Sequence, residues 1–359
     1  MKTQLLYKTV FILFLLPAIA LGNNPSKGKY KKEKTIKKEY TVNKDALLKI
    51  NNSYGNLDIV TYSGNTISIE VNITVSGNDE EKLQKKLDGI NVNFDASASE
   101  VSAKTVFNNN KSWWNWGNNN MSMEVNYKVK LPITNNVDLD NDYGSINLDK
   151  LEGNAKIRCD YGKITTKELM ASNNMISFDY TSNSYFEYIN SGKINADYSG
   201  FTVAKTKKLD ITADYTKSVV EVAEDVNFNC DYGSVNIQKL NNVTGNGDYL
   251  TMRLGDVYKN VDIKGDYGSL KIDNITATAG NVSIQSDYLG ITIGYDPGYN
   301  FNFDISTEYA SVRNTDDFEF TKKTKESTKN YYLGYHGNNN SGNLIKINSD
   351  YGSVTFKKN

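Results

Sequence analysis

The stretch Asp142-Tyr143-Gly144-Ser145 decides the fold, because the chain repeats it at a nearly constant interval. From Tyr143 to Tyr267 the tyrosines of successive copies lie 17 to 19 residues apart. A fixed period of this size is typical of a solenoid, in which each repeat forms one coil. Further copies begin at Asp160, Asp231, Asp266 and Asp350, and an early copy lies at Ser53-Tyr54-Gly55.

Apolar and polar residues alternate on both sides of each tyrosine, but the parity changes at the tyrosine itself. Apolar residues lie six and four positions before it, as at Val137 and Leu139, and three and five positions after it, as at Ile146 and Leu148. The chain therefore turns a corner at Tyr-Gly-Ser, where we expect glycine to supply the unusual backbone conformation. We predict an all-β, right-handed parallel β-helix (β-solenoid) with about 18 residues per coil. A meander of hairpins, one per repeat, is the alternative.

The N-terminal residues 1–22 are predicted to be a signal peptide. Lys2 and Lys8 precede an apolar run of 11 residues, Val10 to Ala20, which is too short to span a bilayer. We therefore expect an exported protein of the periplasm, the outer membrane surface or the extracellular space, with no transmembrane span in the mature chain.

Four further regions follow. Residues 23–40 are rich in lysine and are predicted to be a basic, solvated linker, the alternative being a contact with an anionic envelope surface. Residues 41–132 form an N-terminal β-rich capping region with one short helix, which Asn78 or Asp79 can begin and Gly89 can end. Residues 133–317 are the β-solenoid of Asp-Tyr-Gly repeats. Residues 318–359 are an inserted loop and a closing coil that cap the other end.

The composition limits the class of protein. Hydrophobic residues make up 38% of the chain, which suits a thin solenoid core better than a large globular one, and the net charge of -1 gives no reason to expect nucleic acid as a partner. Cys159 and Cys230 lie four repeats apart, too far for a disulfide, so we predict that both are small buried residues.

The residue before each repeat tyrosine is almost always aspartate. On the parity given above these carboxylates face away from the core, where we expect them to accept backbone N–H bonds at the corner. The alternative is a row of Ca²⁺ sites; no other cofactor is expected. The ladder consists of Asp142, Asp160, Asp179, Asp197, Asp214, Asp231, Asp248, Asp266, Asp287 and Asp350.

The tyrosines form a second ladder. Stacked rings stabilise such an array, and exposed rings would also provide an aromatic stripe for sugars or a protein partner. The sequence leaves open whether the rings are buried or exposed. The ladder consists of Tyr143, Tyr161, Tyr180, Tyr198, Tyr215, Tyr232, Tyr249, Tyr267, Tyr288 and Tyr351.

All three tryptophans, Trp113, Trp114 and Trp116, lie in one asparagine-rich loop. Aromatic rings with amide neighbours are a candidate glycan-binding patch. The alternative is that the rings cover the side or the end of the solenoid.

The chain resembles a family of exported bacterial β-strand-repeat proteins known as putative adhesins, a domain of unknown function. The resemblance lies in residues 51–59, in the strand that ends Val129-Lys130-Leu131-Pro132, in the Asp-Tyr-Gly-Ser repeats and in residues 342–347. It covers nearly all of the mature chain. The resemblance implies a β-solenoid in the cell envelope and supplies no catalytic residues.

Catalysis has little support in the sequence. His336 is the only histidine, which excludes histidine-based triads and multi-histidine metal sites, and no metal site is predicted. We predict a non-enzymatic exported cell-envelope protein, an adhesin or binding scaffold that presents a solenoid face to a glycan or to an envelope or surface protein. The alternative is a carbohydrate-binding or carbohydrate-active β-helix protein of the lyase or glycosidase type.

Overall fold

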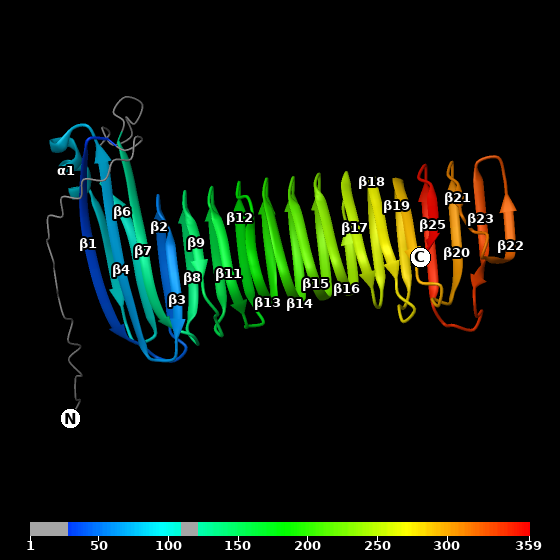
Figure 1. Ribbon diagram of the computed structural model, residues 1–359, viewed down its shortest axis with the longest axis horizontal. Coiled ribbons are helices and arrows are strands. Elements are labelled where there is room, and N and C mark those ends of the chain that lie inside the picture. The colour runs from blue at the N-terminus through cyan, green and yellow to red at the C-terminus, as the bar shows by residue number, and fades with distance from the viewer. Residues whose placement is uncertain (1–27, 109–120) are drawn as a thin grey trace. The chain divides into compact units, whose positions relative to one another are not determined.

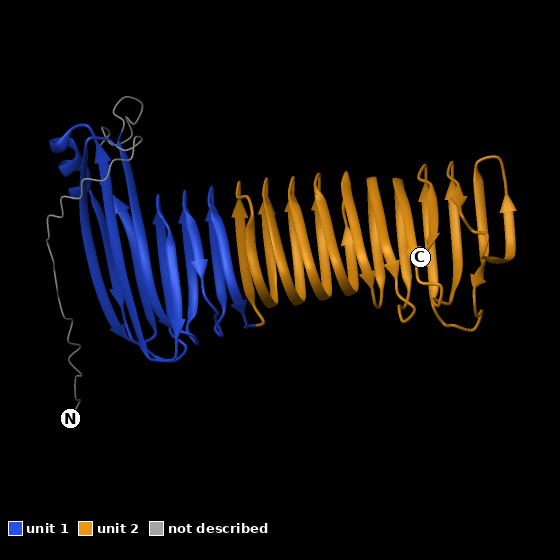
Figure 2. Cartoon of the chain, viewed as in Figure 1, with its two compact units in different colours: residues 1–171 blue, residues 172–359 orange. Residues whose placement is uncertain are grey.

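A computed structural model describes residues 28–108 and 121–359. These residues contain 25 β-strands and one α-helix, which confirms the all-β class (Figure 1). The chain divides into two compact units, residues 1–171 (unit 1) and residues 172–359 (unit 2), and each is described by itself (Figure 2). The predicted signal peptide at 1–22 lies outside the described residues.

Unit 1 contains two layers of strands. The first layer has the order β5-β6-β2-β8-β10, in which β2, β8 and β10 lead into the tyrosine corners. The second layer has the order β1-β4-β7-β3-β9-β11, in which β3, β9 and β11 follow the corners. The bounds are β1 Tyr30–Thr41, β2 Leu47–Ser53, β3 Leu57–Tyr62, β4 Thr66–Gly77, β5 Ile90–Ala96, β6 Glu100–Phe107, β7 Ser122–Pro132, β8 Asn136–Asp142, β9 Ser145–Leu148, β10 Ala155–Asp160 and β11 Lys163–Leu169.

The repeats of unit 1 pair in parallel, as predicted. Val137 of β8 faces Ala155 of β10, so equivalent residues of neighbouring coils lie side by side. The early copy around Tyr54 is part of the same stack, because β2 pairs with β8 and β3 pairs with β9. Among the residues of unit 1 that the structure describes, antiparallel pairing occurs only where β1, β4 and β7 meet and where β5 meets β6. The hand of the coil stays a prediction.

The short helix forms where the sequence indicates. Helix α1 spans Glu80–Asp88, the side chain of Asp79 accepts the N–H of Lys82, and Gly89 follows the last turn. Leu83 and Leu87 are its buried residues.

The predicted basic linker over 23–40 is corrected by the structure. Tyr30–Thr41 is strand β1, which pairs antiparallel with β4 along its whole length. None of its side chains is fully buried, so the strand lacks the alternation of buried apolar residues by which a strand is recognised from sequence. Its lysines lie on an edge strand, where charge discourages pairing with another chain.

Unit 2 repeats the two-layer arrangement with longer strands. The first residues of β14 lie in the second layer, and the residues after Thr206 lie in the first layer. The strand pairs in parallel with β15 at an offset of 17 residues, so that Gly200 faces Lys217. The bounds are β12 Asn174–Asp179, β13 Ser184–Asp197, β14 Gly200–Asp214, β15 Lys217–Asp231, β16 Ser234–Asn246, β17 Leu250–Val257, β18 Val261–Ile275, β19 Val282–Tyr295, β20 Phe301–Glu308, β21 Val312–Arg313, β22 Glu319–Lys325, β23 Lys329–His336, β24 Leu344–Asp350 and β25 Val354–Lys358.

The last coil in the sequence is not the last in space. Strands β24 and β25 pair on one side with β19 and on the other with β20 and β21. The hairpin of β22 and β23 continues beyond β20 with antiparallel pairing. The C-terminal residues are therefore inserted into the stack, and the hairpin covers the end that β20 would otherwise expose.

The core lies between the two layers. In unit 2, Phe178 of the first layer packs against Phe186 and Phe201 of the second, with ring centroids 6.1 and 5.7 Å apart. Cys159 and Cys230 are buried and free, as predicted. No helical segment among the described residues has the length and apolar character that a membrane span requires.

A buried polar network supports the corners of unit 1. Asn141, two residues before Tyr143, donates to the Gly55 carbonyl at 3.0 Å and accepts from Asn52 at 2.9 Å. Thr105 donates to Asn52 at 2.7 Å and contacts the Tyr127 hydroxyl at 2.8 Å. The chain of bonds crosses from one layer to the other, so these polar groups are satisfied although water cannot reach them.

We expect Asn141→Ala to destabilise the protein by about 1–3 kcal/mol, because it leaves the buried Gly55 carbonyl and one Asn52 N–H without partners. Chemical denaturation followed by circular dichroism measures the change. Asn147→Ala is the matched control, since the exposed Asn147 side chain donates to Asp58 at 2.7 Å, and its cost should stay within about 0.5 kcal/mol. Equal costs for the two variants would contradict the network's role.

Candidate binding face

The corner residue with the unusual backbone is the tyrosine, which corrects the expectation for glycine. The repeat tyrosines from Tyr54 to Tyr351 have φ between 51° and 65°, the left-handed region. The glycine after the tyrosine is needed instead because the neighbouring coil leaves no space for a side chain. A Cβ on Gly144 would lie 1.9 Å from the carbonyl oxygen of Gly55, so glycine lets neighbouring coils approach closely.

The tyrosine rings stack face to face along each unit. In unit 1, Tyr54, Tyr143 and Tyr161 stack at 5.2 and 5.1 Å. In unit 2 the stack runs from Tyr180 to Tyr288 and continues through Tyr351 to Tyr309, with centroids 4.6 to 5.2 Å apart and planes within 8°. From Tyr143 onward the tyrosines are about half exposed, between 43% and 57%, whereas Tyr54 at the start of the stack is more buried.

The stacking decides what this ladder can bind. Each ring covers the face of its neighbour, so the solvent meets ring edges and hydroxyl groups. Sugars and cations bind aromatic rings over an open face. The tyrosine ladder is therefore a structural feature with a row of hydroxyls, and it does not form the open aromatic stripe considered from the sequence.

The aspartate ladder joins successive corners in unit 2. The backbone N–H of each aspartate donates to the carboxylate of the preceding one, at 2.8 to 3.2 Å from Asp179 through Asp287. From Tyr180 to Tyr249 the N–H of each repeat tyrosine donates in turn to the carbonyl of the next aspartate, as Tyr198 does to Asp214 at 3.0 Å. The carboxylates thus accept backbone N–H groups, but from the next coil and not from their own turn.

Like charges along this ladder repel one another. Desolvation, followed by the carboxylates of Asp266 and Asp350, raises the pKa of Asp287. In unit 1, desolvation and then Asp140 and Asp160 raise the pKa of Asp142. Among the described residues, no three or more His, Cys, Asp or Glu side chains lie together so that they could share a metal ion, and the Ca²⁺ alternative stays a prediction.

The tryptophan patch, Trp113, Trp114 and Trp116, lies outside the described residues. The glycan-binding role predicted for these three residues therefore stays a prediction.

A groove lies on the outer face of the first layer of unit 2, and sequence reasoning missed it. Two rows of side chains, five and three residues before the tyrosines, form its walls. The buried residues between the rows, among them Ile211, Phe228 and Gly245, form its floor through their backbone, and the hollow measures about 580 Å³. One wall consists of Lys193, Asp210, Asn227, Thr244 and Asp262, and the other of Asn195, Thr212, Asn229, Asn246 and Lys264. We call this feature the amide groove.

Hydrogen bonds orient the groove walls. Asn227 donates to Asp210 in one wall, and Asn246 donates to Asn229 in the other, both at 2.8 Å. Each bond uses one N–H of an amide that carries two, so further donors and acceptors remain at the surface.

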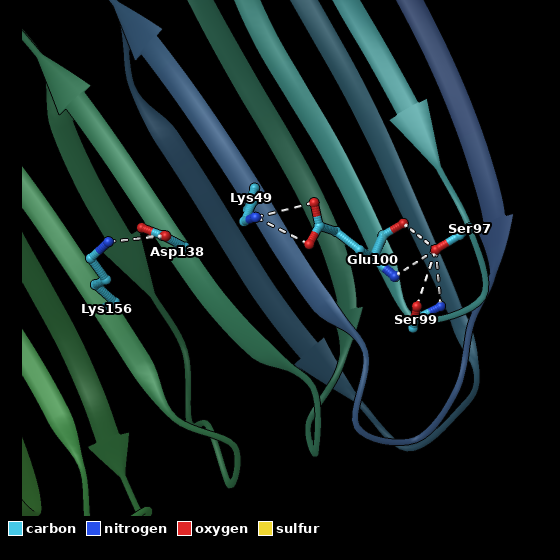
Figure 3. A network of polar contacts seen from close by, with 6 residues as sticks. All are labelled: Lys49, Ser97, Ser99, Glu100, Asp138 and Lys156. Carbon is cyan, nitrogen blue, oxygen red and sulfur yellow. Dashed lines mark hydrogen bonds and ion pairs between the residues drawn. The ribbon is translucent and has the colours of Figure 1, made fainter.

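The equivalent positions of unit 1 differ in chemistry. Lys49, Asp138 and Lys156 lie in register five residues before their tyrosines, and they form ion pairs (Figure 3). Lys156 contacts Asp138 at 3.2 Å, and Lys49 contacts Glu100 at 3.1 Å, while Glu100 itself meets the Ser97 side chain through its backbone. Ion pairs alone can cover a sheet face that is exposed to solvent. Solvent exposure therefore does not explain why unit 2 has amides and hydroxyls at these positions.

The sequence carried only a weak signal for the groove. Polar residues that alternate with buried ones are expected on any solvated strand face. The recurrence of Asn and Thr at the same two positions of consecutive repeats was the one available sign.

Comparisons with known proteins give no family. No family model matches the chain, and no curated protein matches it. Among solved structures, a putative cell adhesion protein from Clostridium sporogenes is similar at 13% identity, over 91% of this chain and all of that one, with a TM-score of 0.16. Putative adhesins from Parabacteroides merdae (13% identity, 74% of this chain and 97% of that one, TM-score 0.30) and Bacteroides fragilis (9%, 91% and 97%, 0.29) are also similar. At such TM-scores these likenesses carry no argument.

The pKa of Asp287 gives a prediction for pH dependence. Because folding raises this pKa, the stability linked to the group is fully present below about pH 4 and is lost as the pH rises through the folded-state pKa. Asp287→Asn removes the charge, so the variant should melt above the wild type at pH 7 and together with it at pH 3.

Asp273→Asn is the control of opposite sign. Desolvation acts to raise the pKa of Asp273, but hydrogen bonds from Lys271 at 2.8 Å and Arg253 at 2.7 Å outweigh it and lower the pKa. This variant should lose stability at pH 7, and the loss should shrink as the pH falls through the folded-state pKa. A lower melting temperature for Asp287→Asn at pH 7 would show that repulsion does not govern the aspartate ladder.

Proposed function

We propose that the chain is a non-enzymatic binding scaffold of the cell envelope, adhesin-like, that holds a partner against the outer face of unit 2. The observation that carries the proposal is the amide groove. Its walls present oriented amides and hydroxyls over an open hollow of about 580 Å³ on the sheet face. Export is supported by the N-terminal sequence, in which Lys2 and Lys8 precede the apolar run from Val10 to Ala20.

The surroundings of His336 support a binding role over catalysis. The side chain is 6% exposed, its Nδ1 lies 2.9 Å from the Tyr299 carbonyl oxygen, and its ring packs against Tyr295 and Phe301. A histidine enclosed in this way is not placed to transfer protons to a bound substrate.

The test is binding without turnover. The full chain should bind at least one member of a polysaccharide panel saturably, while release of reducing ends or of unsaturated sugar products stays at the level of buffer. Steady turnover would establish the carbohydrate-active alternative and overturn the proposal. Protease added to intact cells tests the location, since a surface scaffold should be cleaved and a periplasmic one protected.

A further inference from the structure

We propose that the ligand of the amide groove is an uncharged, extended polysaccharide that lies along the direction in which the strands stack. This inference rests on the proposed function, because it names the ligand class and the orientation for the same face. The shape of the groove, the chemistry of its walls, its charge and the rigidity of its floor each point to this class.

The shape of the groove suits a flat chain. The two walls lie two residues apart along each strand, which corresponds to about 6.6 Å. The groove crosses β13, β14, β15, β16 and β18, so at about 4.8 Å per strand it is about 19 Å long. It runs across the strands, and an extended β-linked sugar chain advances by a step similar to the strand spacing. Each sugar would therefore meet an equivalent pair of wall residues.

The walls offer the groups that sugars require. Amides such as Asn229 and Asn246 and hydroxyls such as Thr212 and Thr244 can both donate to and accept from sugar hydroxyls. The side chains between the walls point into the core, so the floor presents backbone and Cβ atoms on which the C–H groups of a pyranose ring can rest. Polar walls around a less polar floor match a sugar ring, which has equatorial hydroxyls and an apolar face.

The charge of the groove favours a neutral ligand. Its walls hold two lysines, Lys193 and Lys264, and two aspartates, Asp210 and Asp262, so their formal charges cancel. The aspartate ladder lies two residues beyond the second wall, from Asp197 to Asp266, and would repel a polyanion.

The floor beneath the groove is rigid. A Cβ on Gly245 would lie 2.1 Å from an atom of the Phe228 ring, so this ring fills the space beneath the next coil as well as its own. Phe228 is 4% exposed, and the close packing leaves the backbone above it little room to move. A preformed floor reduces the entropy that is lost when an extended chain binds.

The test uses four hexasaccharides of matched length and isothermal titration calorimetry with the full chain. Cellohexaose and the N-acetylglucosamine hexamer are neutral, the galacturonate hexamer is anionic and the glucosamine hexamer is cationic. At least one neutral hexamer should bind, about tenfold or more tightly than either charged one. Its Kd should change less than twofold between 50 and 500 mM NaCl, because no ion pair contributes to the complex.

Variants place the binding in the groove. Asn229→Ala combined with Asn246→Ala should weaken binding of the neutral hexamer about tenfold or more, since each amide supplies hydrogen bonds to the sugar. Thr212→Ala combined with Thr244→Ala is a second, independent pair. Asn348→Ala is the matched control, because Asn348 is also exposed and also lies three residues before a repeat tyrosine, but outside the groove, and it should bind as the wild type does. All of these side chains are exposed, and melting temperatures confirm that the variants fold.

The outcomes separate this inference from the proposed function. Tighter binding of a charged hexamer overturns the inference, as does neutral binding that neither pair of groove variants weakens, yet in both cases a binding scaffold remains. Failure of every neutral hexamer to bind also overturns it, and the polysaccharide panel then shows whether the chain binds elsewhere. Turnover of any hexamer overturns the proposed function itself.

Discussion

Every coil has to place a tyrosine in the left-handed backbone region, and the rest of the structure depends on how neighbouring coils stabilise that corner. The conformation costs about 1–2 kcal/mol for a residue with a Cβ. A ring stacked at 4.6 to 5.2 Å gains about 0.5–1.5 kcal/mol per pair, and the Tyr-to-Asp backbone bonds add to it. The two effects are of similar size, so a corner is stable only beside another corner. This makes the repeat cooperative.

Sequence reasoning could predict the coil because its signals are local. Parity, period and the change of phase at the tyrosine are properties of a few adjacent residues, and they led to the parallel stack. The order of coils is not local, since β24 and β25 insert before β20 by pairing with strands more than 40 residues away. The left-handed conformation was assigned to glycine because glycine adopts it most readily, whereas stacking stabilises it at tyrosine. Strand β1 was missed because backbone bonds hold it and no buried side chain marks it.

The candidate site was harder to predict than the fold. The aspartates and tyrosines, which recur most clearly in the sequence, stabilise the corner of each coil and do not line the groove. The groove depends on side chains from five strands that alignment in register brings together, and each of them alone resembles a solvated residue. Comparison of the units shows the difference, because ion pairs such as Lys156–Asp138 occupy positions that hold amides such as Asn227 in unit 2. The proposed binding function therefore depends on which side chains occupy these positions of the repeated coil.

The central claim is that stacked tyrosines stabilise the strained corners. A double-mutant cycle on Tyr198 and Tyr215, stacked at 4.9 Å, tests it most directly, with alanine at each site so that the Cβ and the backbone strain remain. The account predicts a coupling free energy of about 0.5–1.5 kcal/mol. The pair Tyr180 and Tyr215, which are two coils apart, should show a coupling below about 0.5 kcal/mol. Coupling near zero for Tyr198 and Tyr215 would contradict the account.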